Sequence, residues 1–445
     1  MTATGRAKDT EPTWFGQPRG LTVLFLTNMW EQFSYYGMRA LLVYYMTLEL
    51  LIEQGMSSFI YGTYTAMAYF TPIFGGIIAD RWLGKRRAVI IGGSIMALGH
   101  FFMTFEPLLY VALGAIALGN GFFLPSLPSQ INDLYKADDP RRPWAYNVYY
   151  VGVNIGGFLA PLICGTLGEF YGWHYGFGVA GVGMVIGLMI YIWGGKYLPE
   201  ERRVLPSDAE SASRDNFDRR TILLLGALIG AVTLFRGAYE QVGNTVALWA
   251  NEGVDRLAGG FEIPMTWFQS LNPLFVIVFT PFLLAHWRRQ AEAGKEKSPL
   301  QKMAIGALVV AAAYLMLALA AALQGDGQAS WLWLVGFFLV LTTGELYILP
   351  NGLGLFARLA PPRFGASTVA SWFFAIFTGS LAGGFVGSFW NDLPSAIFFS
   401  LLAGLAVAAA GFLKLLDHPL RRVIAERSGL DAARPGPAER TEAQL

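Results

Sequence analysis

Charged and polar side chains interrupt an otherwise apolar stretch near the N-terminus, NMWEQFSYYGMRALLVYYM at residues 28–46. Glu31, Tyr35 and Arg39 follow one another at intervals of four residues, so a helix would carry them on one face. An ionisable side chain at membrane depth is costly, and it usually persists where it lines a pathway. This polar stripe therefore indicates that a polar substrate is bound or passed within a membrane.

Three other positions extend the charge inventory of the apolar segments. The candidate intramembrane ionisable residues are three acids and two bases: Glu31, Arg39, Arg236, Glu240 and Glu345. Arg236 precedes Glu240 by four residues, so either Arg39 or Arg236 can neutralise Glu240. No base is evident for Glu345. A buried carboxylate without a cation is expected to be protonated or to await a cationic ligand.

Motifs of soluble catalysis are missing from the sequence. It contains no phosphate-binding loop, no G-x-S-x-G and no His pair with metal-ligand spacing. Its formal net charge of +1 offers no general attraction to nucleic acid. We therefore expect neither an enzyme nor an ATP-driven pump, with no cofactor, no metal and no nucleic-acid partner.

The composition indicates the elements that position these residues. Only 14% of the 445 residues are charged, against roughly 25% in soluble domains. Segments of about 20 apolar residues can each span a bilayer. We predict twelve of them, near 20–50, 57–79, 88–106, 108–134, 144–167, 174–196, 221–250, 265–286, 301–323, 331–356, 365–389 and 393–415.

The predicted spans divide six and six around a polar segment. We expect an N-terminal tail (1–19), a first six-helix bundle (20–196), a linker (197–220), a second six-helix bundle (221–416) and a partly disordered C-terminal tail (417–445). Lys and Arg gather in alternate loops, whereas the opposite loops hold only Arg256. This asymmetry places the linker and both termini in the cytoplasm. We expect a monomeric, multi-pass protein of the cytoplasmic membrane.

The loop between the second and third spans, GGIIADRWLGKRR at residues 75–87, resembles the signature loop of the major facilitator superfamily. The resemblance implies an all-α integral membrane fold, with twelve transmembrane helices in two six-helix bundles around a central cavity. Asp80 and the basic cluster after it are then expected to pair across the cytoplasmic helix ends and to control how the bundles part.

Further segments resemble the proton-dependent oligopeptide transporters, the POT family. The first-helix stretch is similar to that family's E-x-x-E-R-F-x-Y-Y-G motif, and the linker is too short and too polar for the two additional helices of many bacterial members. The other similar segments, in the family's order, are 119–135, 146–162, 235–244, 267–275, 344–361 and 370–384.

The POT resemblance implies a binding site for short peptides. By it, Arg39 holds a substrate carboxylate or pairs with Glu240, Glu345 receives the peptide amino group, and Asn154 and Asn272 hydrogen-bond the peptide backbone. The aromatic residues implied for the pocket are Tyr35, Tyr36, Tyr69 and Trp372.

The chain departs from the family pattern at residues that the resemblance implies in proton coupling and in binding the substrate carboxylate. Asn28 and Gln32 flank Glu31 where the family has a second acid and an arginine, and Leu124 replaces the family's fourth-helix lysine. Arg236 stands where an apolar residue is usual. Proton binding, if retained, would fall on Glu31 or Glu345, and Arg39, Arg236, Glu240 and Asp80 would form the gates.

These features predict a secondary transporter of di- and tripeptides or peptide-like substrates by alternating access, with reduced or altered proton coupling. Its partners would be a small-molecule substrate, the lipid bilayer and protons. Two alternatives stay open: a proton-independent facilitator or exporter of amines or carboxyl-modified peptides, and a ligand sensor that transports nothing.

Overall fold

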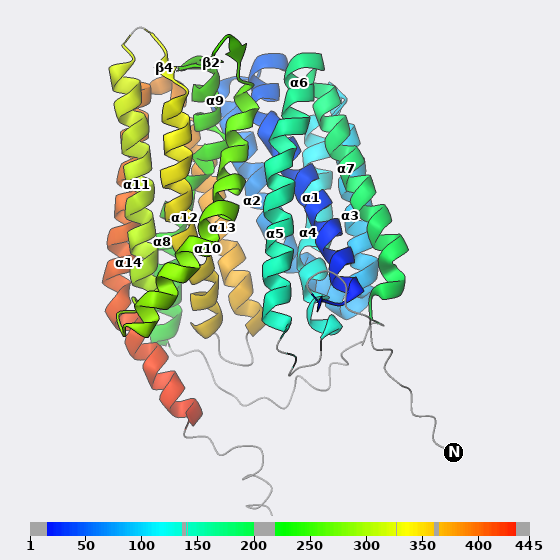
Figure 1. Ribbon diagram of the computed structural model, residues 1–445, viewed down its shortest axis with the longest axis vertical. Coiled ribbons are helices and arrows are strands. Elements are labelled where there is room, and N and C mark those ends of the chain that lie inside the picture. The colour runs from blue at the N-terminus through cyan, green and yellow to red at the C-terminus, as the bar shows by residue number, and fades with distance from the viewer. Residues whose placement is uncertain are drawn as a thin grey trace, which may run out of the picture.

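The computed structural model describes residues 16–135, 139, 141–199, 219–325, 327–359 and 365–432. Most of these residues are helical, and the long helices run side by side between two ends of the molecule (Figure 1). The first half contains α1 (Arg19–Tyr44), α2 (Gln54–Ile78), α3 (Lys85–Phe102), α4 (Leu109–Ser129), α5 (Arg142–Ala160), the π-helical segment η6 (Pro161–Gly165), α6 (Thr166–Tyr171) and α7 (Trp173–Gly194).

The second half repeats this pattern of long helices. It contains α8 (Arg219–Tyr239), the 3-10 helix η9 (Glu240–Gly243), α9 (Thr245–Glu252), the 3-10 helix η10 (Met265–Ser270), α10 (Leu271–Glu292), α11 (Pro299–Leu323), α12 (Leu332–Leu359), α13 (Gly365–Gly387) and α14 (Ser395–Ala432). Each of the twelve predicted spans overlaps one long helical segment of this series.

Nine helical segments within the described ranges are long and apolar enough to cross a membrane. The helices α1, α2 and α3 lie beside them although they are not among the nine (Figure 1). Two of these carry the charges noted above, since α1 holds Glu31 and Arg39 and α3 begins at Lys85. These charged residues, which are predicted to bind substrate or to gate, make α1 and α3 more polar than the nine apolar segments.

The helices pack as two bundles. In the first, α1 packs against α5 and α7, α3 against α4 and α7, and α2 against α4. In the second, α11 packs against α12 and α14, α8 against α13 and α14, and α10 against α12. The bundles meet where α2 contacts α13 and where α5 contacts α10. A central site would lie between these two contacts, where the bundles face each other.

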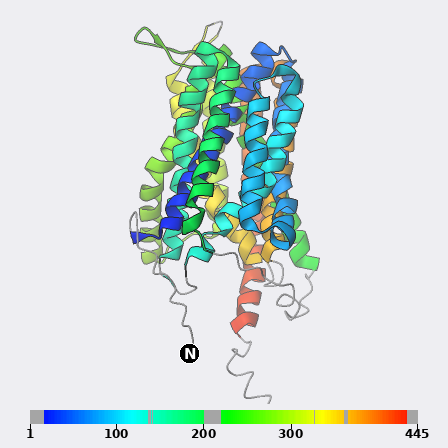
Figure 2. The ribbon, with the colours of Figure 1, turned by 90° about the vertical axis from the view of Figure 1, so that its right-hand side faces the viewer.

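The two ends of the molecule differ. The start of α1 and the end of α14 lie at one end, which we call the terminal end (Figures 1 and 2). The opposite, strand end carries β1 (Val254–Asp255), β2 (Leu257–Ala258), β3 (Phe261–Glu262) and β4 (Ala329–Ser330). Strand β1 pairs with β4 in parallel and β2 pairs with β3 antiparallel. The loop-charge prediction would place the terminal end in the cytoplasm.

Helix α14 is longer than the sequence indicates. It continues through Ala432, so the predicted tail boundary at residue 417 falls inside it. Asp417 accepts hydrogen bonds from Ser298 Oγ at 2.6 Å and from Gln301 Nε2 at 3.1 Å, which attach the extension to the start of α11. The predicted tail beyond residue 432, and most of the predicted N-terminal tail and linker, lie outside the described residues.

Candidate functional site

An ion network joins the two bundles at Glu240, the first residue of η9. Arg39 Nη2 on α1 lies 2.6 Å from Glu240 Oε2, and Arg236 Nη2 on α8 lies 2.6 Å from Glu240 Oε1. Ser380 Oγ on α13 donates to Oε1 at 3.0 Å, and Arg39 Nε donates to the hydroxyl of Tyr61 at 2.5 Å. All five side chains are buried. The sequence allowed either arginine to pair with Glu240, and the structure has both pairs.

Aromatic rings surround Arg236. The guanidinium carbon lies 4.9 Å from the ring centre of Tyr239 and 5.6 Å from that of Tyr69, distances suited to cation–π contact. Tyr69 stacks on Phe373 with ring centres 6.4 Å apart. Arg236 Nε is buried and has no hydrogen-bond partner among the described residues. Tyr69, predicted as a pocket residue, thus contacts the ion network.

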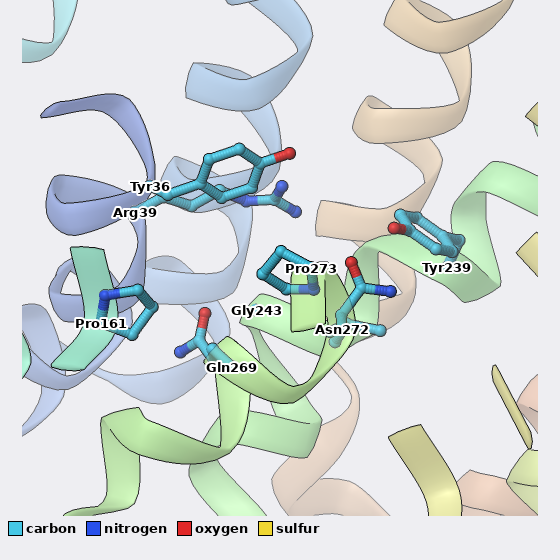
Figure 3. Close-up of a pocket in the computed structure, with 9 residues that line it drawn as sticks. Tyr36, Arg39, Pro161, Tyr239, Gly243, Gln269, Asn272 and Pro273 are labelled. Atoms are coloured by element: carbon cyan, nitrogen blue, oxygen red, sulfur yellow. The ribbon is translucent and has the colours of Figure 1, made fainter. Parts of the chain in front are cut away.

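A cavity lies beside this network, between the bundles (Figure 3). Its empty volume of about 410 Å³ includes space open to solvent. In Figure 3 the side chains of Tyr36 and Arg39 come from one side and those of Tyr239 and Asn272 from the other. The lining residues are Tyr36, Arg39, Pro161, Tyr239, Val242, Gly243, Gln269, Asn272 and Pro273.

Three predicted binding residues line the cavity: Tyr36, Arg39 and Asn272. Sequence reasoning missed two lining residues, Tyr239 and Gln269. Both belong to the segments that resemble POT helices, where Tyr239 directly precedes Glu240 and Gln269 lies shortly before Asn272. Their positions in these segments, beside residues already predicted for the site, could have identified them as lining residues. The remaining predicted residues, which do not line the cavity, are Tyr35, Tyr69, Asn154, Glu345 and Trp372.

Glu345 on α12 lies directly behind the cavity wall. Asn272 Nδ2 donates to Glu345 Oε2 at 2.5 Å and to Thr342 Oγ1 at 3.0 Å, and Tyr239 is also a neighbour of the carboxyl group. Within the described ranges, Glu345 forms no ion pair, although it is buried. An acid screened from the cavity by one amide side chain can be reached by a ligand that displaces that amide.

Glu31 is separated from the ion network. Its carboxyl group is buried and accepts a hydrogen bond from Gln32 Nε2 at 2.7 Å, and none of the described basic side chains pairs with it. Asn28 Nδ2 donates to the carbonyl oxygen of Tyr149 on α5, at 3.2 Å. These contacts stay within the first bundle, whereas Arg39 contacts the second.

Tyr35, Asn154 and Trp372 are held mainly by neighbours from their own bundles. Tyr35 packs edge-on against Tyr36 with ring centres 5.4 Å apart. Asn154 Nδ2 donates to the carbonyl oxygen of Tyr150 at 2.9 Å, one helical turn earlier. Trp372 packs edge-on against Phe356 with ring centres 5.4 Å apart. Their binding roles stay predictions.

Buried polar side chains join the bundles between the cavity and the strand end. Ser58 Oγ on α2 donates to Asn244 Oδ1 at 2.9 Å, and Gln54 Nε2 donates to the carbonyl oxygen of Gly387 on α13 at 2.9 Å. Tyr44 Oη on α1 donates to the carbonyl oxygen of Ala247 at 2.7 Å. The strand end is therefore closed by direct contact between the bundles.

Asp80, in the segment predicted as the gating loop of the terminal end, lies in the π-helical segment η3 (Ala79–Leu83) that continues α2. It is exposed and forms no ion pair among the described residues. Of the basic cluster after it, Lys85 Nζ pairs with Asp133 Oδ2 at 2.8 Å, and Arg86 donates to the carbonyl oxygen of Gly195. The cluster does pair across helix ends, within the first bundle. A gating role for Asp80 stays a prediction.

Two helical bundles, with Arg39 in the wall of a cavity between them and the buried acids Glu240 and Glu345 bonded to its wall, are the arrangement expected of a membrane carrier. A model of the POT family matches residues 86–211 and 205–401. The chain is 30% identical to the di-/tripeptide transporter of Lactococcus lactis subsp. cremoris, covering 94% of this chain and 98% of the relative. It is 31% identical to the peptide transporter YePEPT of Yersinia enterocolitica, covering 95% and 98%.

Solved structures agree with this assignment. A glutamine-for-glutamate variant of the peptide transporter POT, solved with sulfate, has a TM-score of 0.86 and 28% identity over 93% of this chain and 97% of that one. The same variant solved with alafosfalin has a TM-score of 0.85 and 28% identity over the same shares. The chain belongs to the POT family. It is a membrane transporter of the major facilitator fold and not an enzyme, which confirms the predicted family and fold class.

Proposed function

We propose that the chain carries di- and tripeptides, or molecules that resemble them, across the cytoplasmic membrane by alternating access. The observation that carries this proposal is the presence of a guanidinium and a carboxyl group at one cavity, Arg39 in its wall and Glu345 behind Asn272. A zwitterionic peptide has a carboxylate for the first and an ammonium group for the second. The names of the Lactococcus and Yersinia relatives support a peptide substrate.

Each charged residue then has a role in binding. Arg39 presents its guanidinium to the substrate carboxylate, which competes with Glu240 for it. Glu345 takes the peptide ammonium group when Asn272 turns from the acid to the peptide backbone. Tyr35, Tyr36, Tyr69, Asn154 and Trp372 complete the proposed site as aromatic walls and backbone partners.

Alternating access requires the strand-end contacts to break while contacts form at the terminal end. The Arg39–Glu240 pair joins the bundles at the cavity, so it must open in the outward-facing state. Asp80 and the basic residues after it would act at the terminal end. With both termini cytoplasmic, the described conformation is closed to the outside.

Proton coupling is proposed to be reduced or altered. Glu31 and Glu345 are the candidate proton carriers, and each hydrogen-bonds an amide but no described cation. A protonated acid suits such surroundings better than a carboxylate. The same observation favours a second candidate, a proton-independent facilitator or exporter of amines or carboxyl-modified peptides. A non-transporting sensor is a third.

Uptake by the purified protein in liposomes separates these candidates. We expect accumulation of radiolabelled alanyl-alanine and competition by other dipeptides, with less inhibition by carboxyl-blocked dipeptides. Strong acceleration by an inward proton gradient would show ordinary coupling, whereas equal rates with and without it would favour the facilitator. Preference for blocked peptides would overturn the carboxylate role of Arg39. Binding without uptake would leave the sensor.

A further inference from the structure

Glu240 is held by two arginines that belong to different bundles. Arg39 on α1 binds Oε2 at 2.6 Å and Arg236 on α8 binds Oε1 at 2.6 Å. Arg236 and Glu240 are four residues apart on the continuous helical stretch of α8 and η9, so they move together. A motion that separates the bundles therefore breaks the Arg39 pair and keeps the Arg236 pair.

The Arg236–Glu240 pair is important because Glu240 is deeply buried and has few other partners. The carboxylate is only 1% exposed, and the only other side chain described as bonding it is Ser380, on α13. The charged or titratable side chains that interact electrostatically with it are Arg39 and Tyr35 on α1, Tyr61 on α2, Arg236, and Tyr314 on α11. On α12, Glu345 bonds Asn272 instead.

A buried carboxylate that loses its only cation is strongly disfavoured. If Arg39 were its only partner, separation of the bundles would leave the Glu240 carboxylate without a cation, and it would have to bind a proton. With Arg236 in place, Glu240 keeps a guanidinium on Oε1 after Arg39 has left Oε2. The carboxylate then has a partner in both conformations.

We propose that Arg236 is a positioning residue that holds Glu240 in its charged form while Arg39 leaves it, so that the gate opens without a proton on Glu240. This inference rests on the proposed alternating-access function.

The test measures opening of the gate itself. Spin labels at Leu51→Cys and Leu323→Cys, both exposed and near the strand ends of the two bundles, report their separation in the purified full chain. The native Cys164 is buried and is not expected to react. Distances are measured between about pH 5 and about pH 8, a range that lies above the ordinary carboxyl pKa and in which a carboxyl group of raised pKa titrates.

We expect Glu240→Gln to leave the pH profile of the open fraction as it is in the wild type. Arg236→Met should make opening fall with rising pH, by up to about tenfold per unit, because the protonated fraction of an ionised carboxyl falls tenfold per unit. Adding Glu240→Gln to Arg236→Met should abolish the new slope. Arg236→Lys, which keeps the charge, should follow the wild type.

Two results would overturn the proposal: an Arg236→Met profile identical to the wild type, or a wild-type slope that Glu240→Gln removes. The second comparison does not need the methionine variant to fold. Alanyl-alanine should raise the open fraction of the wild type at constant pH. Because the labels report opening without substrate, failure of peptide uptake would sink the proposed function but leave this measurement valid.

Discussion

Glu169 and Thr266 join the two bundles although they are 97 residues apart. The carboxylate of Glu169, on α6, accepts the backbone N–H of Thr266 at 2.9 Å and its hydroxyl at 2.5 Å. The same carboxylate accepts the backbone N–H of Met265 at 3.0 Å. These donors lie at the start of η10, so a residue of the first bundle caps a helix of the second.

We predict that Glu169→Gln weakens closure of the strand end. A charged acceptor strengthens each of these hydrogen bonds, and the amide keeps only one oxygen for three donors. Hydrogen bonds to charged groups contribute about 1.5–3 kcal/mol each, so loss of one would raise the open fraction at least about tenfold. The measurement is the spin-label distance between Leu51→Cys and Leu323→Cys.

Glu49→Gln provides a matched control for this variant. Glu49 is an exposed acid at the same end of the first bundle, and its loss should leave the distance distribution unchanged. Equal distributions for Glu169→Gln and the wild type would show that the cap does not hold the bundles together.

Gly62 on α2 and Gly384 on α13 bring the backbones of the two bundles into close contact near the strand end. A Cβ at Gly62 would collide with Cα and N of Gly384 and with the carbonyl oxygen of Ser380, all parts of the backbone. Backbone cannot move aside as a flexible side chain can. We predict that Gly62→Ala prevents full closure and lowers dipeptide exchange in liposomes by about tenfold or more.

Gly114→Ala is the control for Gly62→Ala, because a Cβ at Gly114 on α4 would meet no atom within 4 Å. An alanine there should be neutral or slightly stabilising, since alanine favours helix by up to about 1 kcal/mol over glycine. Full activity in both variants would contradict the idea that α2 and α13 must approach this closely.

The sequence predicts the elements and the ion network well because both have local signals. Helix spans follow from apolar length, and Arg236 and Glu240 are visible as an i,i+4 pair. The bond from Glu169 to Thr266 has no such signal, because it depends on how α6 meets η10. Tyr239 was overlooked because aromatic residues are common throughout these helices.

The shared face of Glu31 and Arg39 shows a limit of helical periodicity. Four residues turn a helix by about 400°, so eight residues place the two side chains about 80° apart. This rotation is enough to direct Arg39 to Glu240 in the second bundle and to leave Glu31 beside Gln32 in the first. Residues aligned along one helix can therefore face two separate environments.

The helical start of the predicted tail, from residue 417, has a reason in the apolar pattern. Charged residues predict a partly disordered segment, while Leu413, Leu416, Leu420 and Val423 recur at helical spacing and are buried, so α14 extends into it. The apolar face continues past residue 415, where the predicted span ends, and packing against the rest of the bundle keeps this segment helical.

We predict that Glu345→Gln weakens binding of the peptide amino group at the proposed amine site. Glu345→Gln keeps the size of the side chain and a partner for Asn272, whose Nδ2 lies 2.5 Å from the carboxyl oxygen. It removes the charge that would bind a peptide ammonium group. Loss of one charge-assisted hydrogen bond is about 1.5–3 kcal/mol, so the affinity for alanyl-alanine should fall at least about tenfold.

N-acetylated alanyl-alanine separates this role from general damage. It has no ammonium group, so its affinity should be low in the wild type and should change little in Glu345→Gln. Titration calorimetry of both ligands on both proteins measures the four affinities. An equal loss for both peptides would indicate that Glu345 only supports the structure through Asn272. A loss confined to the free amine would identify Glu345 as the group that recognises it.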